Sequence, residues 1–281
     1  MTVRIVSDTA CDLPDELTEE LGIELVPLHV RFGATELVDR RELGTKEFWA
    51  RCAEADELPS TAAPSPGAFQ DAFARLADQG ADGVVCITLS GKLSATYQSA
   101  AQAARDMASR LPVEVLDSMS ATMGEGLVVL EAAEAARQGA SLQDVMSRAQ
   151  AACGRLSVFG TLDTLENLKK GGRIGGAAAL VGTLLSIKPV LEVRNGVVEQ
   201  ESRQRTRARS LRYLADKARA AAPLDRLAAV GAEAPDLDEF VSLVSDIPTR
   251  SPLFVGDIGP VIGTHAGPGT IGVAWLAQAT P

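Results

Sequence analysis

The first 150 residues alternate between short apolar runs and amphipathic segments. The run from Val84 to Leu89 is almost continuously apolar, as expected for a strand buried on both faces of a parallel sheet. The same pattern predicts strands over 3–8, 25–32 and 113–116, and helices over 14–21, 45–55, 68–79, 94–109, 124–138 and 142–152. The stretch 58–67 is rich in Pro and Ser, which predicts a loop. Alternating strands and helices predict an α/β domain with a doubly wound, mostly parallel sheet.

The pattern changes near Gly154. Residues 190–202 alternate on both sides of Asn195-Gly196, which predicts a β-hairpin. The remaining pattern predicts strands over 156–162 and 227–230, helices over 164–170, 206–221 and 237–244, an Ala/Leu-rich helix before residue 187, and strand with a glycine-rich turn over 253–276. We therefore expect an α/β domain over residues 1–154 and an α+β domain with a mixed sheet over 155–281.

Composition narrows the class of function. The net charge of −10 argues against a general nucleic-acid binder, because phosphate contacts require a basic surface. Aromatic residues make up 4% of the chain, so a large apolar site would be lined mainly by Leu, Val, Ile, Ala and Met. The 4 cysteines are far apart in the sequence, without a C-x-x-C pair, which argues against a disulfide framework.

The sequence also predicts a soluble, cytoplasmic protein. Residues 1–8 contain no apolar core of a signal peptide, and the longest apolar run, 174–187, is too short to cross a bilayer.

Standard catalytic signatures are missing. Gly91-Lys92 is followed by Leu93 rather than Ser or Thr, so it is not a phosphate-binding loop, and no G-x-G-x-x-G motif occurs. Ser94 lacks the G-x-S-x-G context of an α/β-hydrolase. With 2 histidines and no clustered Cys, a zinc site is not expected, and no cofactor is predicted.

Small polar residues at loop tips remain as candidates. Ser94 follows the buried strand 84–89 and precedes a helix, the position at which open α/β sheets bind ligands. A helix cap explains Ser94 equally well. Thr61 lies in the Pro-rich loop, and His265 lies in the glycine-rich stretch 259–269, which also suits a tight strand connection. Asp12 is interpreted as a helix cap.

Two basic clusters stand out in this acidic chain. Arg205, Arg209 and Arg212 would share one face if they lay on one helix. Lys169, Lys170 and Arg173 follow the predicted helix 164–170. Either cluster suits a solvated face or a docking surface for an acidic or phosphorylated partner.

Seven segments occur in the order and at the spacing found in one family. Together they resemble the DegV family of bacterial fatty-acid-binding proteins, and the likeness runs almost end to end. The segments are Ser7–Pro14, Thr61–Ser65, Leu89–Ala100, Asp117–Gly126, Thr164–Gly175, Ile187–Leu191 and Gly259–Gly269.

The resemblance implies a function for these segments. It implies two domains holding a long-chain fatty acid, whose carboxylate is bound by Thr61, Ser94 and His265. It also implies a separate ATP-binding fatty acid kinase subunit that phosphorylates the carboxylate, with Arg173, Arg205 and Arg207 on the surface that faces it. The protein itself would be a carrier without catalytic activity of its own and without a cofactor, and ligand exchange would allow transient membrane contact.

The proposed ligands suit this chemistry. Two hydroxyls and an imidazole bind a carboxylate without a strong fixed charge, whereas an Arg would hold it in a bidentate pair. The sequence departs from the family pattern at Ala62, Ala63 and Ala95, which puts pocket width or partner preference in doubt.

Two other classes of function remain open. Ser94 and His265 could act as nucleophile and base in a lipid hydrolase or acyltransferase, although no third orienting residue is recognisable. The basic segment 203–212 could serve a regulatory or nucleic-acid-binding module. The chain length and saturation of a preferred acyl group are not encoded in any recognisable motif.

Overall fold

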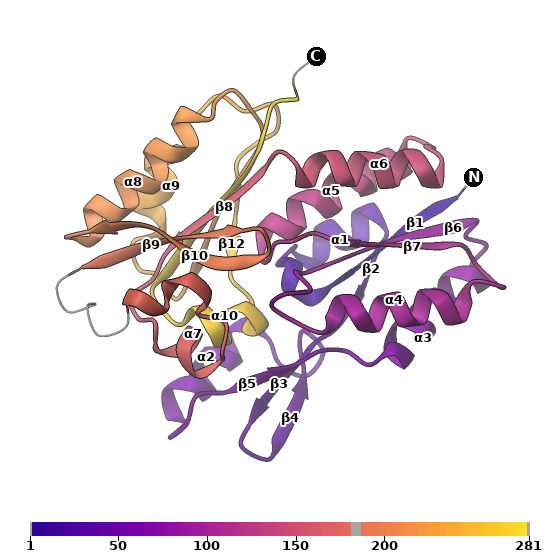
Figure 1. Ribbon diagram of the computed structural model, residues 1–281, viewed down its shortest axis with the longest axis horizontal. Coiled ribbons are helices and arrows are strands. Elements are labelled where there is room, and N and C mark those ends of the chain that lie inside the picture. Colours follow the sequence, from indigo (N-terminus) through magenta and orange to yellow (C-terminus); the bar gives the residue numbers. More distant parts are fainter. Residues whose placement is uncertain (1, 181–186, 280–281) are drawn as a thin grey trace.

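The computed structural model describes residues 2–180 and 187–279. Its N-terminal half contains a four-stranded parallel sheet in the order β2-β1-β6-β7. These strands are Val3–Asp8 (β1), Ile23–Val26 (β2), Gly83–Thr88 (β6) and Val113–Asp117 (β7). Helices α3 (Pro66–Asp78) and α4 (Thr96–Met107) lie on one side of this sheet, and α5 (Met123–Arg137) and α6 (Leu142–Cys153) lie on the other (Figure 1). The predicted doubly wound α/β fold is confirmed.

The strands of this sheet are apolar on both faces because helices cover both. Val84 and Cys86 pack with the helices α3 and α4, while Val85 and Ile87 pack with α5 and α6. Successive side chains of a strand point to opposite faces, so a strand between two helical layers must be apolar throughout.

A small second sheet was not predicted. The run 25–32 was expected to be one strand, but it contains β2 and β3 (His29–Phe32), which belong to different sheets and are separated at Pro27. β3 lies between β4 (Thr35–Val38) and β5 (Ser60–Ala62), and β5 occupies part of the predicted loop 58–67. Helix α2 (Thr45–Glu54) lies near this sheet. The 3₁₀ helix η1 (Thr9–Cys11) and α1 (Asp15–Leu21) follow β1 in the chain.

The C-terminal half contains a mixed six-stranded sheet in the order β10-β9-β8-β13-β11-β12. Only the pair β11–β12 is parallel within it. Its strands are Leu156–Thr161 (β8), Lys188–Arg194 (β9), Val197–Gln204 (β10), Leu224–Ala232 (β11), Phe254–Asp257 (β12) and Thr270–Ala277 (β13). The predicted mixed sheet is confirmed, and so is the hairpin, with Arg194 paired to Val197 across the turn.

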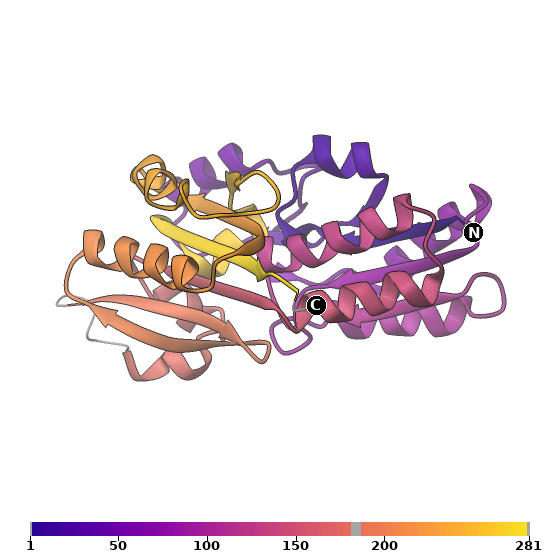
Figure 2. The ribbon, with the colours of Figure 1, turned by 90° about the horizontal axis from the view of Figure 1, so that it is seen from above.

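The two faces of the C-terminal sheet have different partners. Val273 and Trp275 pack with α8 (Arg207–Ala220) and α9 (Leu237–Val244), whereas Ala274 and Leu276 pack with residues of α5. One face therefore has its own helical cover, and the other faces the N-terminal half (Figure 2).

Four predicted segments of the C-terminal half differ from the structure. The helix predicted over 164–170 is α7 (Glu166–Lys170), and α8 begins only at Arg207. The predicted Ala/Leu-rich helix contains a 3₁₀ turn, η2 (Gly175–Leu180), and its continuation over 181–186 lies outside the described residues. The predicted glycine-rich turn contains a helix, α10 (Pro260–Ala266). The predicted domain boundary at Gly154 falls between α6 and β8.

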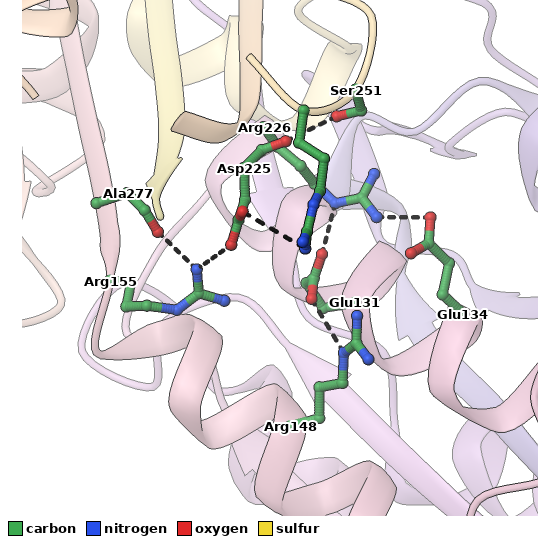
Figure 3. A network of polar contacts seen from close by, with 9 residues as sticks. Glu131, Glu134, Arg148, Arg155, Asp225, Arg226, Ser251 and Ala277 are labelled. Atoms are coloured by element: carbon green, nitrogen blue, oxygen red, sulfur yellow. Dashed lines mark hydrogen bonds and ion pairs between the residues drawn. The ribbon is translucent and has the colours of Figure 1, made fainter. Parts of the chain in front are cut away.

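A charge network joins the two halves on the α5 side (Figure 3). Glu131 of α5 accepts hydrogen bonds from Arg148 of α6 at 3.1 Å and from Arg226 of β11 at 2.7 Å. Arg226 also pairs with Glu134 at 2.5 Å. Arg155, at the start of β8, donates to Asp225 at 2.6 Å and to the Ala277 carbonyl at 2.5 Å.

Over 2–180 and 187–279, no helix has both the length and the apolar character required to cross a membrane. All four cysteines are free thiols, as expected.

Candidate functional site

An apolar cavity lies where the C-terminal sheet faces the N-terminal half. Its volume is about 140 Å³, counted as the space open to the centre of a water-sized sphere. β8, β9, β11 and β13 supply one wall, while Leu28, Leu89 and Ala121 of the N-terminal half and Val261 and Ile262 of α10 also line it. Most of its lining is aliphatic, as the scarcity of aromatic residues predicted, and Phe159 is the one aromatic residue among the described lining residues.

Two glycines of the C-terminal sheet line the cavity and leave space in it, because they have no side chains. Gly160 of β8 and Gly272 of β13 are paired directly across the two strands, and both line the cavity. A glycine inside a strand leaves the backbone open to close approach by another group. Neither residue was predicted from the sequence as part of a site, although glycine within an apolar strand pattern is a recognisable signal of close approach.

Thr61 and His265 meet at the cavity. The Thr61 Oγ1 and His265 Nε2 atoms lie 2.8 Å apart, although the residues are 204 positions apart in the chain. β5 carries Thr61, and its pairing with β3 places it opposite Val30. His265 lies near the end of α10 and packs closely against Gly171, where a Cβ atom would lie 2.3 Å from Nδ1.

The imidazole of His265 is neutral at neutral pH. Burial lowers its pKa to about 4, and the positive charge of Arg173 contributes in the same direction. His265 can therefore act as a neutral hydrogen-bonding group rather than as a cation. Its Nδ1 is buried and has no hydrogen-bond partner within the described part of the chain.

Ser94 also lines the cavity, in the turn between β6 and α4. Its Oγ lies 2.8 Å from the Thr96 Oγ1 and accepts a hydrogen bond from the Thr96 backbone N–H at 3.3 Å. The N-cap position of α4 is Ala95 rather than Ser94. Ser94 thus supports the first turn of the helix and faces the cavity at the same time.

Arg173 lies at this site as well, which the sequence analysis did not predict. Its Nε donates to the Leu93 carbonyl at 2.9 Å and its Nη1 to the Gly171 carbonyl at 2.6 Å. These contacts bring its guanidinium next to Ser94 and His265 in the cavity lining. The expectation that the site would lack a strong fixed charge is therefore wrong.

The two other candidate arginines lie elsewhere. The guanidinium of Arg207 is paired with Asp236, with hydrogen bonds of 2.7 and 2.9 Å. Arg205 is exposed in the bend between β10 and α8. Because α8 begins at Arg207, Arg205 does not share a helical face with Arg209 and Arg212, and that prediction is wrong.

Within residues 2–180 and 187–279, neither a metal site nor a nucleophile–base pair is formed. Among the described residues, no group of three or more His, Cys, Asp or Glu side chains is arranged to hold a metal ion. The hydrogen-bond partner of His265 is Thr61, and that of Ser94 is Thr96, so the arrangement required for a serine hydrolase is not present in this conformation.

The departures from the family pattern leave the site intact. Ala95 has φ −76°, which any residue can adopt, so its backbone does not require glycine. Ala62 and Ala63 are partly exposed and do not line the cavity.

Comparison with known proteins places the chain in a family. The family model described as "Uncharacterised protein, DegV family" matches residues 2–278. A DegV domain-containing protein of Streptomyces coelicolor is 35% identical over 277 residues, which cover 96% of this chain and 97% of that protein.

Solved structures of the same family share the fold. A fatty-acid-binding DegV family protein from Thermus thermophilus has a TM-score of 0.90 and 35% identity, covering 99% of this chain and 100% of that one. DegV of Bacillus subtilis, described as a fatty acid binding protein, has a TM-score of 0.87 and 29% identity, with 99% and 100% covered. The chain belongs to the DegV family.

Proposed function

We propose that this protein is a carrier that binds a long-chain fatty acid in the interior cavity, with the carboxylate at Thr61, Ser94 and His265. One observation carries the proposal. The cavity is mainly aliphatic, and Thr61, His265, Ser94 and Arg173 form a polar group in its lining, which also contains Thr122, Glu192 and Thr270. Such a distribution of polarity matches a ligand with one polar end and a long apolar tail. The fatty acids bound by the Thermus thermophilus and Bacillus subtilis proteins support it.

The apolar wall would provide most of the affinity. Each buried methylene contributes about 0.8 kcal/mol before the cost of association is subtracted. The polar groups would orient the ligand, and Arg173 would add an attractive field for the carboxylate.

Mass spectrometry of the purified protein tests the proposal. We expect an organic extract to contain a stoichiometric long-chain fatty acid. Substitution of Ser94→Ala or Thr61→Val should weaken fatty acid binding by about tenfold, since each removes one hydrogen bond to a charged group. Ser99→Ala, on the helix α4 that follows Ser94, does not line the cavity and is the control, which should bind normally. A wild-type protein that neither contains nor binds a fatty acid would refute the proposal.

We further propose that a separate ATP-binding kinase subunit phosphorylates the bound carboxylate. The exposed Arg205 and the cavity-lining Arg173 are the residues proposed to face this subunit, whereas Arg207 is held by Asp236. The test is ATP-dependent formation of an acyl phosphate, trapped as a hydroxamate, when a candidate kinase subunit is added. Arg205→Glu should lower this rate without changing the lipid content. An unchanged rate in this variant would remove Arg205 from the proposed surface.

A further inference from the structure

Asp12 is a buried carboxyl in an unusual backbone conformation. It has φ +53° and ψ 22°, in the left-handed region that non-glycine residues rarely occupy. Its exposed fraction is 6%. Asp12 ends the 3₁₀ helix η1 as its C-cap residue, and the predicted role as the cap at the start of α1 is wrong, because Pro14 holds that N-cap position. Both the strained backbone and the burial of a carboxyl cost free energy, so the surrounding structure must compensate for them.

The carboxyl of Asp12 makes a contact between the two halves of the molecule. Its Oδ1 accepts a hydrogen bond from the backbone N–H of Gly259 at 3.0 Å, 247 positions away. A Cβ atom at position 259 would lie 2.7 Å from this oxygen, so the close approach requires glycine there. Gly259 has φ −70°, which means that the requirement comes from space rather than from backbone conformation.

Gly259 is the N-cap residue of α10, which forms part of the cavity wall. This seven-residue helix is too short to be stable alone, so its place depends on tertiary contacts. At its far end, the Asn167 side chain donates to the Thr264 carbonyl at 3.0 Å, a contact within the C-terminal half. The Asp12–Gly259 hydrogen bond attaches the beginning of the helix to the N-terminal half, which also supplies Thr61.

We propose that Asp12 is a positioning residue for the head-group site, because its hydrogen bond to Gly259 fixes α10 and thereby sets His265 against Thr61. This role rests on the proposed function, since it concerns the same carboxylate site. The same contact accounts for the glycine at position 259, because a Cβ atom there would lie too close to the Asp12 carboxyl.

Paired ligands distinguish positioning from general stability. Affinity is measured for hexadecanoic acid and for 1-hexadecanol, which share a chain but differ in the polar group. For Asp12→Ala we expect the affinity for the acid to fall about tenfold, the value of one lost hydrogen bond of about 1.4 kcal/mol, with little change for the alcohol. Asp12→Asn retains an acceptor oxygen for the Gly259 N–H and should restore the affinity for the acid.

Two further variants distinguish a role in positioning α10 from a general contribution to stability. Gly259→Ala should reproduce the selective loss without altering the buried carboxyl, so the proposal remains testable if Asp12→Ala does not fold. Glu131→Ala weakens a different contact between the halves, the charge network that includes Arg226 (Figure 3), and it should lower the melting temperature without changing the ratio of acid to alcohol affinity.

The imidazole of His265 provides an independent signal. The chain has 2 histidines, so the NMR titration of His265 can be assigned by comparison with a His29→Gln variant. The midpoint near pH 4 should move toward 6.5 in Asp12→Ala and Gly259→Ala, because water reaches the loosened site, and should stay in place in Glu131→Ala.

Each outcome has a definite meaning. Wild-type protein that binds neither ligand contradicts the proposed function, and the positioning role with it. Wild-type protein that binds the acid, with Asp12→Ala and Gly259→Ala leaving the acid-to-alcohol ratio and the His265 midpoint unchanged, contradicts the positioning role alone. A ratio that changes equally in Glu131→Ala also contradicts it.

Discussion

The stability of this protein should fall as the pH rises from about 5.5 to 8. Four of the buried carboxyls in the N-terminal half have raised pKa values: Asp8, Asp12, Asp39 and Glu125. Burial raises the pKa of Asp8 and of Asp12 to about 7, that of Asp39 to about 6, and that of Glu125 well above 4.5. Hydrogen bonds from the Leu89 and Ala10 backbone N–H groups to Asp8 oppose the rise but do not cancel it.

The sign follows from proton binding in the two states. The unfolded chain releases these protons near pH 4, whereas the folded protein retains them to pH 6 or 7. Between these values the folded state binds more protons, so the free energy of unfolding decreases with rising pH. Each carboxyl with a folded pKa of about 7 lowers the free energy of unfolding by about 2 kcal/mol between about pH 5.5 and 8. Asp39, with a folded pKa of about 6, lowers it by about 1 kcal/mol.

His265 acts in the opposite direction. Its pKa is lowered to about 4, so the unfolded state binds more protons below pH 6.5, and stability is lost as the pH falls. This opposing contribution is about 1.4 kcal/mol at about pH 5.5. The net expectation from Asp8, Asp12, Asp39 and His265 is a loss of about 3 kcal/mol on going to pH 8, or a melting temperature lower by about 6–12 °C, and the raised pKa of Glu125 acts in the same direction as those of the other carboxyls.

Urea unfolding at the two pH values measures this difference directly. Asp12→Asn removes one of the buried ionisable groups and should reduce the pH dependence by about 2 kcal/mol. Asp71→Asn, an exposed carboxyl on α3, is the control and should leave the pH dependence unchanged. A wild-type free energy of unfolding that stays constant or increases from pH 5.5 to 8 would show that the buried carboxyls ionise without penalty, which would refute this reasoning.

Two further substitutions test the cavity and the contact between the halves. Gly272→Leu should project a side chain into the cavity and abolish binding of both the fatty acid and the alcohol, with circular dichroism unchanged; full binding would place the ligand elsewhere. Arg226→Ala should lower the free energy of unfolding by about 3 kcal/mol, measured in urea, because it leaves the buried Glu131 with one fewer cationic partner. A loss below about 1 kcal/mol would show that Arg148 alone neutralises Glu131.

Local patterns predicted the elements whose partners are close in sequence. The hairpin at Asn195-Gly196 is present because both turn residues adopt positive φ, +51° and +79°, as a type I′ turn requires. The run 25–32 was misjudged because its apolar pattern continues across Pro27, while the chain moves there from one sheet to another. Strand pairing between β3 and β5 is a long-range contact, and no local pattern specifies it.

The types of residue at the candidate site could be predicted from the sequence, but the contacts that bring them together could not. Residues 259–269 suggested a turn because glycine and proline disfavour helices, yet α10 forms there because contacts from Asp12 and Asn167 hold both of its ends. Asp12 was interpreted as a local cap because its partner is 247 positions away. Arg173 was placed outside the site because its contacts with Leu93 and Gly171 arise only in the folded chain.

The position of Arg173 changes how the proposed head-group site would act. A free guanidinium would hold a carboxylate in a bidentate pair and make its release or further reaction costly. Here the Nε and Nη1 groups already donate to backbone carbonyls of Leu93 and Gly171, which fixes the orientation of the guanidinium. In the proposed carrier, Arg173 would therefore attract the carboxylate mainly through its field, while the neutral His265 and two hydroxyls provide weaker hydrogen bonds. Such a site retains the charged end of the ligand and still leaves it available to a second protein.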